Sequence, residues 1–170
     1  EIYMGDWSSD VCSSDLLDKA ISQAGFVRDD LWLTNAVKHF KYEQRGKRRL
    51  HKKPSTGETT ACRWWLTEEL RLVEPQMIVA LGATAARSLL GRPVTISSMR
   101  GEPHPLNDAL LWVTIHPSYL LRIREEADRR AEFIRFVKDL RDVYAAARRT
   151  PPRVQPPERR AAVPSVRRGA

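Results

Sequence analysis

The segment KRRLHKKPS, residues 47–55, places a single histidine, His51, between two groups of cations. Those cations are Lys47, Arg48, Arg49, Lys52 and Lys53. Neighbouring positive charges disfavour the imidazolium, so His51 should stay neutral and keep a nucleophilic lone pair. The pattern fits a loop that holds a histidine nucleophile against a polyanion. The simpler interpretation, which the residues alone favour, is a phosphate-contacting loop whose histidine is incidental.

A second histidine, His116, lies in the segment TIHPSYLLR, at the end of an apolar run. A histidine followed by Pro and Ser at a strand end sits on a sharp turn, with its ring directed toward a ligand. Ser118 is expected to cap the helix that follows, and Arg122, one turn further on, suits a phosphate. The alternative is a histidine that only closes the turn, and the residues leave both interpretations open.

Asn35 ends the apolar run LWLTNAV, and its carboxamide offers the donor and the acceptor that reading a base edge requires. The alternative, an asparagine that caps a turn, is favoured by the residue alone. Cys62 and His39 are candidate metal ligands. Two ligands fall short of the roughly four that structural zinc and iron–sulfur clusters use. Cys62 also shares a helical apolar stripe with Leu66, which favours an ordinary buried residue.

The composition describes one basic domain. The chain has 170 residues and a formal net charge of +8, enough length for one core and a charge that attracts polyanions. Nucleic acid is the first expected partner and an anionic membrane surface the second. No apolar run approaches the roughly 20 residues needed to span a bilayer, and two distant cysteines make no disulfide framework. We therefore expect a cytoplasmic protein that does not cross a membrane.

Strands and helices alternate along the sequence. Continuous apolar runs predict buried strands at residues 31–37, 76–82 and 110–115. Helical spacing predicts helices at residues 17–25, 55–73, 83–91 and 124–148. Apolar strands that alternate with helices imply a parallel sheet covered on both faces, a three-layer α/β/α fold with a short, mostly parallel central sheet. In such sheets the ligand site lies beyond the carboxyl ends of the strands, which should bring Asn35 and His39 together with Gly82 and His116.

The two ends of the chain differ from its middle. Residues 1–16, EIYMGDWSSDVCSSDL, are rich in Ser and Asp and show no helical or strand period. They resemble translated adapter read-through at the ends of metagenomic gene fragments, so we predict a non-native segment and assign Cys12 no role. Residues 17–148 form the predicted domain. Residues 149–170, rich in Pro and Arg, are predicted to be a disordered basic tail.

Five segments in this order resemble the uracil-DNA glycosylase superfamily, and most closely its UdgX branch of family 4-like iron–sulfur enzymes. They are TNAVKHFK, GKRRLHKKPS, ACRWWL, EPQMIVALGATAARSLLG and VTIHPSYLLR. The resemblance runs from about Leu17 to Tyr144. KRRLH is its most specific part, because it matches the inserted loop that distinguishes the covalent branch.

The resemblance implies a role for each candidate residue. Asn35 matches the asparagine that reads the uracil edge, with Ser118 beside it in the substrate site, and His116 matches the histidine that stabilises the departing uracil. His51 matches the histidine that captures the sugar C1′ and leaves the protein covalently attached to abasic DNA. The implied DNA contacts are Lys47, Arg48, Arg49, Lys52 and Arg122. The base must first leave the stack, which costs less in a single strand.

The sequence also departs from the family pattern. It contains neither the N-terminal Gly-Glu-rich motif nor the early cysteine pair of the [4Fe-4S] cluster. His39 stands where family 4 enzymes place a cluster cysteine and Cys62 matches another, so the cluster expected in the family is incomplete here. We predict an N-terminally truncated fragment, monomeric and inactive by itself. The alternatives are a hydrolytic family 4-type glycosylase and, for this fragment, a non-catalytic basic nucleic-acid-binding module.

Overall fold

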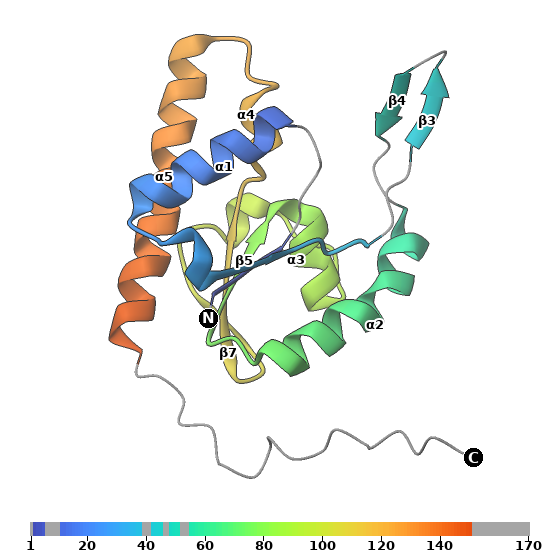
Figure 1. Cartoon of the computed structure of the whole chain (residues 1–170), viewed down its shortest axis with the longest axis vertical. Coiled ribbons are helices and arrows are strands. Elements are labelled where there is room, and N and C mark those ends of the chain that lie inside the picture. Colours follow the sequence, from blue (N-terminus) through green and yellow to red (C-terminus); the bar gives the residue numbers. More distant parts are fainter. Residues whose placement is uncertain (1, 6–10, 39–41, 46–47, 52–54, 151–170) are drawn as a thin grey trace, which may run out of the picture.

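The computed structural model describes the backbone of residues 2–5, 11–38, 42–45, 48–51 and 55–150 (Figure 1). Side chains are described for residues 14–38 and 55–150. The predicted basic tail therefore lies almost wholly outside the described residues, as do His39, Lys47 and Lys52.

The central sheet has five strands in the order β2-β1-β5-β7-β6. The strands are β1 Ile2–Gly5, β2 Leu31–Thr34, β5 Met77–Leu81, β6 His104–Leu106 and β7 Ala109–Thr114. The first four in spatial order run parallel, and the short edge strand β6 runs antiparallel to β7. The prediction of a short, mostly parallel sheet is confirmed.

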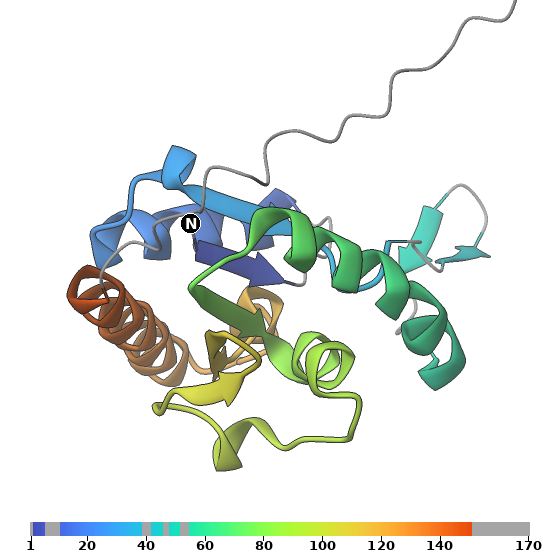
Figure 2. The same ribbon diagram turned by 90° about the horizontal axis from the view of Figure 1, so that it is seen from below.

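Helices cover both faces of the sheet, as Figure 2 shows from below. One face carries α1 Val11–Ala24, α4 Pro117–Leu120 and α5 Glu126–Arg149, and the other carries α2 Thr56–Val73 and α3 Gly82–Leu90. Short 3-10 turns at Arg28–Asp30 and Ile96–Ser98 complete the connections. The three-layer α/β/α prediction is thus confirmed. No helix among the described residues is long and apolar enough to cross a membrane.

Successive residues of the central strands face opposite layers, as the pleat of a strand requires. In β5, Val79 packs toward α1 and α5, whereas the neighbouring Ala80 packs toward α2 and α3. Both faces of β5 are buried, which explains why its sequence is a continuous apolar run instead of an alternating one.

Part of residues 1–16 forms regular structure although the sequence shows no helical or strand period there, and their non-native origin stays a prediction. Ile2–Gly5 form β1, which lies between β2 and β5 and pairs with both, and α1 begins at Val11. A four-residue strand is too short to show a period, and its pairing partners are 29 and 75 residues away along the chain. Pairing with two neighbours, which no local pattern reveals, defines this strand.

The other predicted elements are confirmed with changes at their ends. The strand predicted at residues 31–37 stops at Thr34, where the chain bends away from the sheet. The capping box at the start of α2 is present: Ser55 accepts from the Glu58 backbone, and the Glu58 side chain accepts from the Ser55 backbone. Cys62 is buried on the inner face of α2, as its spacing predicted.

Helix α5 contributes the largest fully buried side chain, Phe136, to the core beside α1 and the sheet. We predict that Phe136→Ala lowers the free energy of unfolding by about 3–5 kcal/mol, because truncation removes buried apolar contacts and leaves a cavity. The matched control is Ile134→Ala on the same helix, where the side chain is 62% exposed, with an expected change of about 0.5 kcal/mol or less. Denaturant unfolding measures both. Equal losses in the two variants would contradict this description of the core.

Candidate active site at the carboxyl edge of the sheet

The four parallel strands end at one edge of the sheet. Thr34 of β2 pairs with Gly5 of β1, and Leu81 of β5 pairs with Thr114 of β7. Asn35, Gly82 and His116 follow three of these ends, so the structure brings them to the same edge, as the sequence predicted. Three strand spacings separate β2 from β7, a distance of roughly 14 Å. Asn35 and His116 therefore lie at the same edge, on strands that are not neighbours.

His116 is the N-cap residue of α4, and its ring is fixed by the turn itself. Nδ1 accepts a hydrogen bond from the Ser118 backbone N–H at 3.1 Å and lies 2.7 Å from the Ser118 hydroxyl oxygen. A backbone N–H can only donate, so this contact favours the tautomer in which Nδ1 accepts and the ring proton lies on Nε2. The turn therefore favours one tautomer of His116.

The prediction that Ser118 caps this helix is wrong. Pro117 occupies the first helical position, where the missing N–H of proline costs no hydrogen bond. The N-cap residue is therefore His116, and its side chain accepts from the Ser118 backbone N–H. His116 consequently fills the capping role. The Ser118 hydroxyl instead contacts the His116 ring and, at 3.5 Å, accepts from Arg122.

Gly82 begins α3 directly against His116. Its φ of +90° lies in the region that glycine alone adopts without strain. A Cβ added there would stand 3.1 Å from the His116 Cβ. The end of β5 thus packs closely against His116, and a larger residue at position 82 would displace the histidine.

Contacts of Thr34 and Lys38 hold the bend that carries Asn35. Lys38 Nζ lies 2.6 Å from both the Thr34 hydroxyl oxygen and Glu69 Oε2, and the Thr34 hydroxyl donates to the same carboxylate oxygen at 3.0 Å. Glu69 belongs to α2, so this network ties the bend that carries Asn35 to the helix layer. Sequence reasoning missed Glu69. The available signal was a carboxylate on the inner stripe of α2, where a charge needs a partner.

Comparison with known proteins identifies the family. A family model described as the uracil DNA glycosylase superfamily matches residues 4–141. The chain belongs to this superfamily. It is 35% identical over 117 residues to a type-4 uracil-DNA glycosylase of Thermotoga maritima, a match that covers 68% of this chain and 57% of the relative. A type-4 uracil-DNA glycosylase of Pyrobaculum aerophilum is 29% identical over 115 residues, 63% of this chain and 55% of the relative. The chain thus spans little more than half the length of these relatives.

The basic segment of this superfamily member is not the loop that its sequence suggested. Arg48–His51 form β4, which pairs antiparallel with β3, Tyr42–Arg45, and His51 pairs with Tyr42. This hairpin stands apart from the body of the domain, beside the start of α2 (Figure 1). Because these side chains lie outside the described part, the roles of Arg48, Arg49 and His51 stay predictions.

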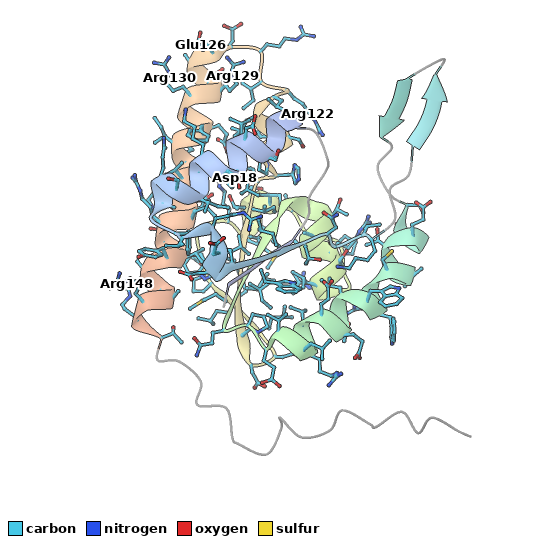
Figure 3. All side chains as sticks on the ribbon, in the orientation of Figure 1. Asp18, Arg122, Glu126, Arg129, Arg130 and Arg148 are labelled. Atoms are coloured by element: carbon cyan, nitrogen blue, oxygen red, sulfur yellow. The ribbon has the colours of Figure 1, made fainter. Side chains whose placement is uncertain are left out.

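Arg122 is exposed at the end of α4. Figure 3 shows it beside the start of α1, at the same end of the molecule as Arg129 and Arg130. Its place next to Ser118 and within two turns of His116 is consistent with the predicted phosphate contact, which no ligand in the structure tests.

The iron–sulfur prediction has little support in the described residues. Cys62 supplies one buried thiol on α2. Within the part of the chain whose side chains are described, no three His, Cys, Asp or Glu residues come close enough to hold a metal ion. The described residues therefore do not by themselves fit a [4Fe-4S] cluster, which needs about four ligands. The cluster stays a prediction.

The Thr34–Lys38–Glu69 network leads to a stability prediction. Glu69→Ala should lower the free energy of unfolding by about 1–3 kcal/mol, because a mostly buried ammonium loses its carboxylate acceptor. Glu68→Ala is the control: this neighbouring carboxylate pairs with the exposed Arg71, and its loss should cost about 0.5 kcal/mol or less. Thermal or denaturant unfolding compares the two. A loss from Glu69→Ala no larger than that from Glu68→Ala would show that the network does not anchor the bend.

Proposed function

We propose that the protein cleaves the N-glycosidic bond between uracil and deoxyribose in DNA. One observation carries this proposal: in a chain of the uracil-DNA glycosylase superfamily, His116 stands at the carboxyl edge of the sheet that also carries Asn35, and its Nδ1 accepts the Ser118 backbone N–H, which favours a ring proton on Nε2. The type-4 uracil-DNA glycosylases among the relatives support it.

The chemistry follows from charge development. When the glycosidic bond breaks, its electron pair moves onto the uracil ring and its carbonyl oxygens. A hydrogen bond from His116 Nε2–H stabilises that charge without prior protonation of the ring. A single donor placed in this way typically contributes a factor of about 10²–10³ in rate.

Asn35 would select the base. Its carboxamide presents one donor and one acceptor, which matches the adjacent carbonyl and N–H of the uracil edge. Cytosine presents the opposite pattern at these positions, so the same amide orientation would leave buried polar groups unpaired. Mismatched hydrogen bonding of this kind discriminates strongly between bases. The fixed bend around Asn35 supports such selectivity, because a side chain on a rigid segment cannot reorient at low cost.

Two fates are open to the sugar. In the first, water adds to C1′ and abasic DNA is released, the outcome that the type-4 relatives support. In the second, the neutral His51 ring forms a nitrogen–C1′ bond, which leaves a substituted imidazolium joined to the DNA while uracil departs as the anion. The sequence KRRLH, of which Arg48–His51 form β4, supports this second candidate and its UdgX assignment.

The extent of the active protein is also part of the proposal. The match to this chain covers only 57% and 55% of the two relatives. We therefore propose that activity requires more of the natural protein than the 170 residues of this chain. Truncation, inactivity of the chain alone, a preference for single-stranded DNA, a monomeric state and a cytoplasmic location stay predictions.

The role of His116 is tested by single-turnover uracil release from a labelled oligonucleotide, with the variants made in the full-length natural protein. His116→Ala should slow release by about 10²–10³-fold, because one hydrogen-bond donor to the leaving base is lost. His104→Ala is the control, since this ring contacts the Met99 carbonyl oxygen in the turn before β6. An unchanged rate in His116→Ala would contradict the role proposed for His116, and no uracil release by the wild-type protein would contradict the proposed function.

The fate of the sugar is decided on a denaturing gel after incubation with uracil-containing single-stranded DNA. Covalent capture gives a band that survives heat and detergent and disappears in His51→Ala. Hydrolysis gives free abasic DNA with repeated turnover and no such band, in both wild type and variant. Neither product, with salt-sensitive binding that ignores uracil, would instead support a nucleic-acid-binding module.

A further inference from the structure

A cluster of charged side chains joins α5 to the end of β7. Arg100 donates from Nη1 to Glu132 at 2.5 Å and from Nε to Asp139 Oδ2 at 2.7 Å. The same Asp139 oxygen accepts the Thr114 hydroxyl at 2.5 Å. Thr114 is only 2% exposed, and the three charged side chains are between 13% and 20% exposed. One carboxylate oxygen therefore joins the guanidinium to the strand.

The cluster lies close to the candidate active site along the chain. Thr114 is the last residue of β7, and His116 follows two residues later. The backbone of Arg100 also forms an isolated parallel β-bridge with Val113. Arg100 is therefore connected to this strand end through its main chain as well as through Asp139. The segment that enters the His116 turn is thus fixed from the α5 side.

Stability alone explains this arrangement poorly. Burial opposes the charge on Arg100, but the hydrogen bonds and charges of Glu132 and Asp139 outweigh it and raise the pKa of the guanidinium above its ordinary value. Arg100 Nη2 is nevertheless buried without a partner among the described residues. Buried ion pairs of this kind contribute little net stability compared with apolar packing. What the cluster does supply is a fixed position for Thr114.

We propose that Asp139, held in place by Arg100, is a positioning residue that sets the orientation of His116 through Thr114. Little space remains beside the histidine, because a Cβ added at Gly82 would stand 3.1 Å from the His116 Cβ. A small displacement of the β7 end would weaken the Ser118–His116 contact and release the ring from its single tautomer. This inference rests on the proposed function only where it concerns rate, since ring orientation is measured without substrate.

The test compares two variants that break the contact with two that keep it. Thr114→Val removes the hydroxyl at nearly constant volume, and Asp139→Ala removes the acceptor oxygens; Thr114→Ser keeps the hydroxyl but loses a methyl group. Asp142→Ala is the control, because this carboxylate lies one turn along α5 and pairs with the exposed Lys138. Long-range ¹H–¹⁵N spectra of the folded protein report which ring nitrogen of His116 carries the proton.

We expect a single Nε2–H tautomer in wild type, Thr114→Ser and Asp142→Ala, and a mixture of tautomers in Thr114→Val and Asp139→Ala. In the full-length protein, kcat for uracil release should fall about 10-fold or more in the two breaking variants, with KM nearly unchanged, because misplacement near the reacting groups is costly.

A wild-type tautomer in both folded breaking variants would overturn the inference. So would a mixture in Thr114→Ser equal to that in Thr114→Val, since packing and not the hydroxyl would then control the ring. If the ring responds as expected while the wild-type full-length protein releases no uracil, the positioning role stands and the proposed function fails.

Discussion

Hydrogen-bonded pairing between β5 and β7 places Leu81 opposite Thr114, and the position of every group near His116 depends on this register. Because of this register, the turn at Gly82 and the turn at His116 leave the sheet side by side. A Cβ added at Gly82 would stand 3.1 Å from the His116 Cβ. A shift of the register by one residue would turn the side chains of β7 to the opposite faces. The apolar side chains on both faces of β5 and β7 prevent such a shift, so the core and the site depend on the same pairing.

Local and distant contacts have different functions at the carboxyl edge. The ring of His116 is oriented by Ser118, two residues away, whereas the bend at Asn35 is tied to Glu69, more than thirty residues away on α2. The end of β7 is tied to Asp139 on α5. Helix α2 in one layer thus fixes the bend at Asn35, and helix α5 in the other layer fixes the end of β7. A rigid frame of this kind suits a site that must bind one base and reject another, because selectivity requires polar groups that cannot adjust.

Much of this arrangement could be predicted from the sequence. Continuous apolar runs identified β2, β5 and β7, a capping box located the start of α2, and the rule for parallel sheets brought Asn35, Gly82 and His116 to one edge. Strand β1 could not be predicted, because four residues show no period and pairing with two distant strands defines them. The contacts of Lys38 with Glu69 and of Arg100 with Asp139 were equally invisible, since helix packing brings these charges together. Ser118 was expected to cap α4 because serine is a common N-cap residue. Pro117 instead occupies the first helical position, which makes His116 the N-cap.

The central claim is that Asn35 and His116 bind one uracil between them at the carboxyl edge. Its most direct test follows the Asn35 side-chain amide and the His116 ring by NMR during titration with a single-stranded oligonucleotide that contains one uracil, against a matched oligonucleotide with cytosine at that position. Both groups should shift together with uracil, and neither should respond in this way to cytosine, whose edge presents the opposite donor and acceptor pattern. Shifts confined to surface cations, or identical responses to the two oligonucleotides, would contradict it.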